Sequence, residues 1–216
     1  IDREIIINEE YEKDQVLFLE EKMNKQNFSH FLDIGANSGY YSFYFASKFK
    51  TLKVKAFEIN IDACDKFKKT LQKNLFKNIE IYNFGLSESK RKVKIKSMVK
   101  NGFTHSNSSI LDGDENYSVQ DFKIKDASLN IGDDILKFKN EKLCIKIDVE
   151  GHEIYTLKGL KNILKYNKCL LLIEISKKNF DIVDNFLKMS DYKLIFKSKY
   201  RLDYIYTNTI SKNYYI

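Results

Sequence analysis

The feature that most constrains the fold is the segment at residues 31–42, FLDIGANSGYYS. Its apolar start, Phe31 to Ile34, predicts a short buried strand, and the amphipathic run from Tyr40 to Phe49 predicts a helix. A parallel strand that enters a helix through a glycine-containing turn points free N–H groups and the positive end of the helix dipole at a ligand. The segment therefore predicts an α/β fold with a ligand site at the carboxyl end of its first strand.

The order of residues in this turn indicates which ligand it holds. A dinucleotide site needs G-x-G-x-x-G, whereas this turn has D-x-G-x-N-x-G, with Asp33, Gly35, Asn37 and Gly39. One glycine is missing and a carboxylate points at the turn, so a ligand with a positive end fits better than a diphosphate. S-adenosylmethionine (SAM) has an ammonium and a sulfonium, and we expect SAM to bind here and NAD not to.

A second acid follows at the spacing that a nucleoside site needs. Residues 52–58 alternate and end in Glu58, which lies 25 positions after Asp33 (58 − 33). Nucleotide-binding folds place an acid for the ribose hydroxyls about 20 residues into the unit. A helix is then expected from Ile61 to Asn74 and a strand from Ile79 to Asn83, before the turn at Phe84 to Ser87.

The densest chemistry lies at residues 143–153, LCIKIDVEGHE. Leu143 to Ile147 reads as a strand, and its period of two places Lys146 and Asp148 on one side at the carboxyl end. Five ionisable groups fall within the eight residues 146–153, and such clusters mark functional sites. A helix is expected from Ile154 to Leu164.

The remaining chain completes the sheet. Residues 1–27 are expected to form a helical cap, and residues 100–118 a long substrate loop that could close over an acceptor. The other expected strands are 90–96, 122–129, 169–174 (ending in Glu174), 193–197 and 202–207, with a helix at 178–188.

Two phrases together resemble a known family. D-x-G-x-N-x-G-x-Y-S and I-K-I-D-V-E-G-H-E-x-x-x-L-x-G-L resemble the motifs of FkbM-type class I SAM-dependent methyltransferases, over roughly residues 31–209. The resemblance implies a Rossmann-like α/β fold in one domain, 1–216, with a mostly parallel seven-stranded sheet, an antiparallel last strand and helices on both faces.

The resemblance and the motifs assign candidate site residues. Cofactor-binding residues are expected to be Asp33, Gly35, Asn37, Gly39, Tyr40, Ser42, Glu58, Asn83, Gly85 and Asp148. Catalytic candidates are Asp148 as the first choice of base, then Glu150 and His152, with Lys146 and Glu174 holding acceptor oxygens. His105, Ser108 and Ser109 are candidates for substrate binding. An alternative has Asp148, Glu150 and Glu174 gather Mg²⁺, although no metal is predicted.

The implied reaction is methyl transfer from SAM to a hydroxyl of a sugar, either nucleotide-linked or part of a surface polysaccharide, with S-adenosylhomocysteine (SAH) as product. The acceptor is expected to be a small molecule or glycan, with or without phosphate. N-methylation, RNA methylation and a non-catalytic SAM-binding role are the alternatives.

Composition supports a globular chain and narrows the partners. With 216 residues, of which 43% are apolar, one domain with a sizeable core is expected. There is no long apolar run and no secretory pattern at Ile1, so a cytoplasmic protein is expected, with the natural start open because Ile1 is not Met. The net charge of +7 comes from lysines that are not gathered into one stripe, which argues against nucleic acid. The three cysteines fit neither a metal site nor a disulfide framework.

Overall fold

The computed structural model describes residues 12–100, 103–111 and 122–209. The helices are α2 (Lys13–Asn24), α3 (Tyr40–Lys48), α4 (Ile61–Lys73), α5 (Gly132–Ile135), α6 (Glu153–Gly159), α7 (Lys161–Tyr166) and α8 (Phe180–Met189), with the 3₁₀ turn η1 (Lys177–Asn179). The strands are β1 (His30–Ile34), β2 (Lys53–Phe57), β3 (Ile79–Tyr82), β4 (Gly85–Ser87), β5 (Arg91–Lys100), β6 (Phe103–Ile110), β7 (Phe122–Ile131), β8 (Lys142–Ile147), β9 (Lys168–Glu174), β10 (Lys193–Lys197) and β11 (Asp203–Thr207).

The main sheet has seven strands in the order β10-β11-β9-β8-β1-β2-β3. The strands from β9 to β3 pair in parallel, whereas β11 is antiparallel to both β9 and β10. β1 lies between β8 and β2, where Phe31 is the partner of both Val54 and Cys144. This confirms the predicted fold class, including the antiparallel last strand.

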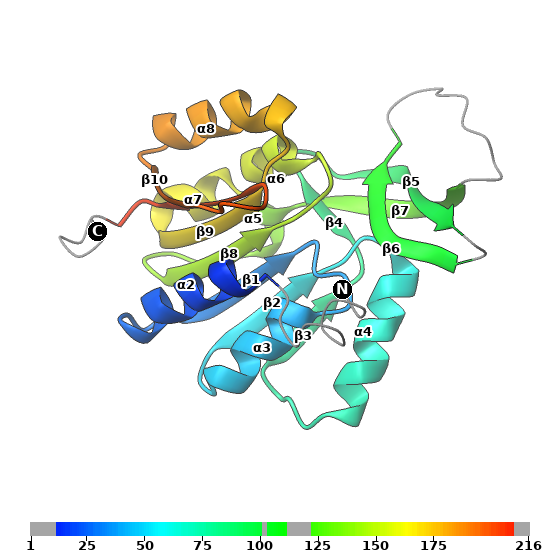
Figure 1. The fold of residues 1–216 in the computed structure, drawn as a ribbon, viewed down its shortest axis with the longest axis horizontal. Helices are drawn as coiled ribbons and strands as arrows, with labels where there is room; N and C mark the ends of the chain where they lie inside the picture. The colour runs from blue at the N-terminus through cyan, green and yellow to red at the C-terminus, as the bar shows by residue number, and fades with distance from the viewer. Residues whose placement is uncertain (1–11, 101–102, 112–121, 210–216) are drawn as a thin grey trace.

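Helices cover both faces of this sheet, and each face has its own core (Figure 1). On one face, Ile154 and Leu157 of α6 and Val183 of α8 pack against inward residues of β1 and β8. On the other face, Leu19 of α2 and Phe45 of α3 belong to the second core. Successive side chains of a strand point to opposite faces, so both surfaces of each central strand are buried.

The alternation in β1 and β8 also places Asp33 and Lys146 on the face of the sheet that α2 and α3 cover. Leu32 and Ile34 belong to the core under α6, whereas Phe31 belongs to the core under α2 and α3. Asp33 follows Phe31 by two positions and is the register partner of Lys146 on β8. One face of the sheet therefore ends, at its carboxyl edge, in a buried acid and a buried base.

A second sheet differs from the expectation for residues 100–118. It has the strand order β4-β7-β5-β6, and residues 103–110 form strand β6, antiparallel to β5. The expectation of a loop is thus wrong for residues 103–110, while residues 101–102 and 112–121 lie outside the described part. The polar composition of β6 was misleading, because at least one of its serines, Ser108, is hydrogen-bonded within the fold.

Two smaller differences concern helices. The helix expected from Ile154 to Leu164 divides at Leu160 into α6 and α7. The expected helical cap at 1–27 corresponds to α2, and the residues before Glu12 are outside the described part. Within the described ranges, no helix has the length and apolar character that crossing a membrane requires.

Candidate active site

A pocket opens at the carboxyl ends of β1, β2 and β8, where an open α/β sheet binds its ligands. It encloses about 600 Å³, counting its open mouth, which is within the range of pockets for small molecules. Its lining consists of Ile34, Gly35, Asn37, Phe57, Glu58, Ile59, Gly85, Leu86, Ser108, Ile110, Leu129, Asp148, Val149, Glu150 and His152.

The glycine turn forms one wall of this pocket. Gly35 and Gly39 have φ angles of +81° and +87°, in the left-handed region that favours glycine. A Cβ at Gly35 would lie 1.7 Å from the carbonyl oxygen of Asp148, and one at Gly39 would lie 2.4 Å from the ring of Phe67. The first glycine is therefore required where two strand ends touch, and the second where the turn packs on α4.

Glu58 lines the pocket from the end of β2. Its Oε2 accepts from the backbone N–H of Asn37 at 2.7 Å, and its Oε1 accepts from that of Asn60 at 2.7 Å. Burial raises the pKa of Glu58 to about 7, although the two N–H donors oppose this shift. A carboxylate held by two backbone donors beside the glycine turn suits the hydroxyls of a ribose.

Asp33 faces α3 and is not among the pocket-lining residues. Its Oδ2 accepts from the N–H of Ser42 at 3.1 Å and from the Ser42 hydroxyl at 2.6 Å, so it fixes the start of α3. Burial raises the pKa of Asp33, against the opposing charge of Lys146. Its Oδ1 has no hydrogen-bond partner among the described residues and could accept from a ligand's ammonium. Tyr40, like Ser42, lies outside the pocket lining.

Next to Glu58, Asn83 supports the backbone that follows β2. Its Nδ2 donates to the carbonyl oxygen of Glu58 at 2.8 Å, and the residue does not itself line the pocket. Gly85 does line it, and a Cβ there would lie 2.8 Å from Leu129 and 3.0 Å from Ile59. This end of the pocket is therefore narrow and largely apolar.

Asp148 follows β8, which flanks β1 on the side opposite to β2 and Glu58. Its Oδ2 accepts from Lys146 Nζ at 2.9 Å, and that ammonium lies over the ring of Tyr41, 5.0 Å from its centroid. Burial would lower the pKa of Lys146, but the charges of Asp148 and Asp33 outweigh this effect and raise it. Lys146 and Asp148, which the strand period was expected to place on one side, form an ion pair.

Glu174 adds a second carboxyl group beside Asp148, from the end of β9. Glu174 is exposed as a residue, but partial desolvation of its carboxyl group and the charge of Asp148 raise its pKa to about 8. The backbone of the neighbouring strand end is fixed too, since the N–H of Asp148 donates to the carbonyl oxygen of Ile34 at 2.9 Å. Two carboxyl groups and one ammonium thus lie at the ends of β8 and β9, and of the three only Asp148 lines the pocket.

Glu150 and His152 both line the pocket but differ in environment. Glu150 is exposed and has a φ of 51° in the turn after β8. His152 is buried, its Nε2 lies 3.0 Å from the Ser87 hydroxyl, and its ring stacks on Tyr155. His152 therefore joins the start of α6 to β4.

Of the three residues expected to bind substrate, the structure separates Ser108 from Ser109. Ser108 lines the pocket, where its hydroxyl contacts Asn60 and Ser97 at 2.8 and 2.6 Å. Ser109 is the next residue of the same strand and points to the opposite face of the second sheet. The side chain of His105 lies outside the described part.

The lining residues that the sequence interpretation missed are mainly apolar: Ile34, Phe57, Ile59, Leu86, Ile110, Leu129 and Val149. Several of them end a strand or follow one directly, which is the signal that could have identified them. The alternative of a metal site gains no support, because no three His, Cys, Asp or Glu residues within the described ranges gather as ligands.

Comparison with known proteins gives one sequence family. The family described as "Methyltransferase FkbM domain" matches residues 33–201. No curated protein sequence matches the chain.

Several solved structures share the fold at low identity. A precorrin-6y C5,15-methyltransferase from Geobacter metallireducens GS-15 is 14% identical with a TM-score of 0.52, over 90% of this chain and 87% of that one. A Staphylococcus aureus protein described provisionally as a caffeoyl-CoA O-methyltransferase is 12% identical with a TM-score of 0.56, over 95% and 88%. The N-terminal domain of human METTL16, solved in complex with SAH, is 14% identical with a TM-score of 0.50, over 90% and 68%.

These structures share the fold alone, whereas the sequence family spans both motifs and most of the chain. The chain belongs to the FkbM family of SAM-dependent methyltransferases.

Proposed function

We propose that this protein transfers the methyl group of SAM to a hydroxyl of a sugar. The observation that carries the proposal is Asp148 in the pocket lining, with Lys146 bound to it and Glu174 at the end of the neighbouring strand β9. Carboxylates accept hydrogen bonds from hydroxyl groups, and more than one acceptor at a rim suits the several hydroxyls of a sugar.

The residues in and behind the pocket fit SAM. Glu58 offers a carboxylate for the ribose, and the slot beside Gly85 is apolar and suits a flat base. Asp33, behind the lining, has a buried oxygen without a partner among the described residues. Crystals of the METTL16 domain, a protein of the same fold, contain SAH. When bound, SAM supplies an electrophilic methyl group, and the protein's own residues must position the acceptor.

Asp148 is the residue we assign to the acceptor hydroxyl. It lines the pocket at the end of β8, while Lys146 holds its carboxylate from the buried side. Glu174 follows on the neighbouring strand β9, where partial desolvation and the charge of Asp148 raise its pKa. The two carboxyl groups can together orient the hydroxyl and take its proton, with Lys146 compensating their charge.

The test is a transfer assay with labelled SAM against panels of nucleotide sugars, glycans, amines and RNA. We expect label in a sugar hydroxyl, and loss of transfer by about a hundred- to ten-thousandfold in Asp148→Asn with little change in SAH affinity. Asp181→Asn, at an exposed position of α8, is the matched control and should transfer normally.

Label that appears only in an amine or an RNA would replace the sugar proposal with one of the other acceptors. Normal transfer by Asp148→Asn would remove Asp148 from its assigned role.

A further inference from the structure

The second sheet supplies five residues to the pocket: Gly85 and Leu86 from β4, Ser108 and Ile110 from β6, and Leu129 from β7. Ser108 is the only one of the five with a polar side chain. Its place in the strand is defined by the pairing of Ser97 with Ser108 across β5 and β6. One face of this sheet thus forms a wall of the pocket and is placed to contact part of a bound ligand.

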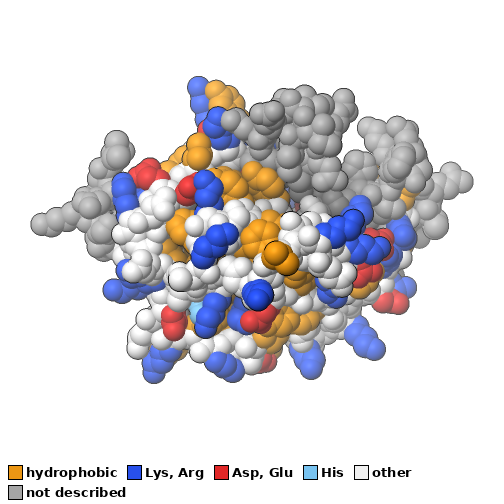
Figure 2. Space-filling model, turned by 90° about the horizontal axis from the view of Figure 1, so that it is seen from below, with side chains coloured by type: hydrophobic (Ala, Val, Ile, Leu, Met, Phe, Trp, Pro, Cys, Tyr) orange, Lys and Arg blue, Asp and Glu red, His pale blue; other side chains and the backbone are white. Residues whose placement is uncertain are grey.

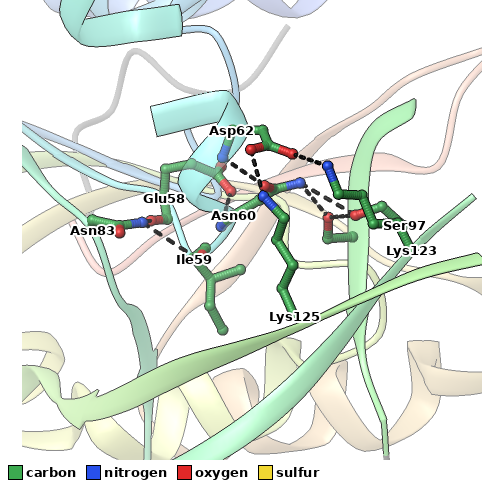
Figure 3. A network of polar contacts seen from close by, with 9 residues as sticks. Glu58, Ile59, Asn60, Asp62, Asn83, Ser97, Lys123 and Lys125 are labelled. Atoms are coloured by element: carbon green, nitrogen blue, oxygen red, sulfur yellow. Dashed lines mark hydrogen bonds and ion pairs between the residues drawn. The ribbon is translucent and has the colours of Figure 1, made fainter. Parts of the chain in front are cut away.

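Asn60 is hydrogen-bonded both to Glu58, as Figure 3 shows, and to Ser108. Its backbone N–H donates to Glu58 Oε1 at 2.7 Å, and its Nδ2 donates to Ser108 Oγ at 2.8 Å. Asn60 therefore connects Ser108 to Glu58, the acid assigned to the ribose. Asp148 and Glu174 lie beyond β1, on β8 and β9, which places the acceptor on the other side of the pocket.

The surroundings of Ser108 fit a flat heteroaromatic ring. Ile59, Ile110 and Leu129 line the same end of the pocket, and Gly85 leaves no room for a side chain there. A hydroxyl in an apolar slot of this kind can donate to a ring nitrogen or accept from an amino group.

The sheet is also tied to α4 from outside the pocket, as Figure 3 shows. Lys123 and Lys125 of β7 both pair with Asp62 in the first turn of α4, the former at 3.2 Å. Asn60 caps the same helix, because its Oδ1 accepts from the N–H of Asp62 at 2.9 Å. These contacts hold the wall in one position relative to Glu58.

We propose that Ser108, positioned by Asn60, contacts the purine base of the bound nucleoside, so that the second sheet belongs to the cofactor site and is not a lid over the acceptor. This inference rests on the proposed SAM-binding function. It changes the part assigned to Ser108 from substrate to cofactor.

The experiment is calorimetric titration with SAH and with 5′-methylthioadenosine, which keeps the nucleoside and lacks the amino acid. In Ser108→Ala both affinities should fall by the same factor of about two- to tenfold, the value of one hydrogen bond. Ser108→Thr keeps the hydroxyl and should bind both ligands as the wild type does. Ser109→Ala, on the opposite face, should also leave both affinities unchanged.

Three results would overturn the proposal. Unchanged affinities in Ser108→Ala exclude a contact with the base, and a loss for SAH alone places Ser108 at the amino-acid end. Ser97→Ala breaks the same network from a residue that does not line the pocket, so an equal loss there would mean support without contact. Absence of SAH binding by the wild-type protein would instead refute the proposed function itself.

Discussion

At the scale of single residues, Glu58 shows how the fold adjusts a functional group. Its carboxyl is buried, which raises its pKa to about 7 from the ordinary 4.5. The folded protein therefore binds this proton more tightly than the unfolded chain does. As a result, the contribution of Glu58 to the free energy of unfolding falls as the pH rises from 4.5 to about 7. Ligand binding should show the opposite dependence, since only the carboxylate accepts from both ribose hydroxyls.

We therefore predict that SAH affinity falls by about tenfold between pH 8 and pH 6, as Glu58 becomes protonated. In Glu58→Gln the affinity should be lower at pH 8, by about ten- to a hundredfold, and nearly independent of pH. Calorimetry of both proteins over this range makes the measurement. A wild-type affinity for SAH that stays constant from pH 6 to 8 would contradict the assignment of Glu58 to the ribose hydroxyls.

His152 illustrates how a residue in a chemical motif can serve packing. Its ring is 6% exposed and bonds Ser87 on β4 while it stacks on Tyr155. We expect His152→Ala to lower the free energy of unfolding by about 1–3 kcal/mol, through a lost hydrogen bond and lost packing. Urea denaturation measures this. If stability is unchanged and transfer is lost, the catalytic assignment from the sequence is restored.

At the scale of elements, α6 packs against β4 without space between them. A Cβ at Gly159 would lie 2.0 Å from the carbonyl oxygen of Ser87, and the Thr156 hydroxyl donates to the carbonyl oxygen of Leu86 at 2.9 Å. This contact places β4, and with it Gly85 and Leu86, at the end of the pocket.

Gly159→Ala should therefore destabilise the protein, although an alanine usually stabilises a helix by about 1 kcal/mol relative to glycine. We expect a loss of about 1–3 kcal/mol, because a backbone oxygen has to move. Lys158→Ala, in the same helix and partly exposed, is the control and should stay within about 0.5 kcal/mol. Denaturation curves that rank the two variants in the reverse order would contradict the close packing.

Several elements could be predicted from the sequence because their signals are local. The strand ends near Asp33, Glu58 and Asp148 follow from alternation and from the acids themselves, and the mostly parallel sheet with its antiparallel last strand follows from the family resemblance. Strand β6 could not be predicted, since its polarity is explained only by partners distant in sequence, such as Asn60. The same holds for Ser109, whose face depends on the register of β5 with β6.

At the scale of the whole molecule, the face drawn in Figure 2 shows how charge is distributed over one side. Lys and Arg side chains are scattered among acidic ones over the face shown in Figure 2. The net charge of +7 therefore does not by itself indicate a nucleic-acid partner.

Ligand binding should also be visible as a property of the whole chain. SAH at about 100 times its dissociation constant should stabilise the folded protein by about 2.7 kcal/mol. For a chain of this size we expect the melting temperature to rise by about 5–11 °C. NAD at the same concentration should cause no shift, because the turn lacks the dinucleotide glycines. A shift with NAD and none with SAH would contradict the assignment of the cofactor.

The contact between Gly35 and Asp148 has a consequence for how the two halves of the site can vary. A side chain at position 35 would have to displace the carbonyl oxygen of Asp148, which is 1.7 Å from the place of its Cβ. The glycine turn and the strand end at Asp148 thus meet backbone against backbone, so a shift of one is passed directly to the other. Gly35→Ala should disturb SAH affinity and methyl transfer together, whereas Glu58 and Asp148 can be altered one at a time.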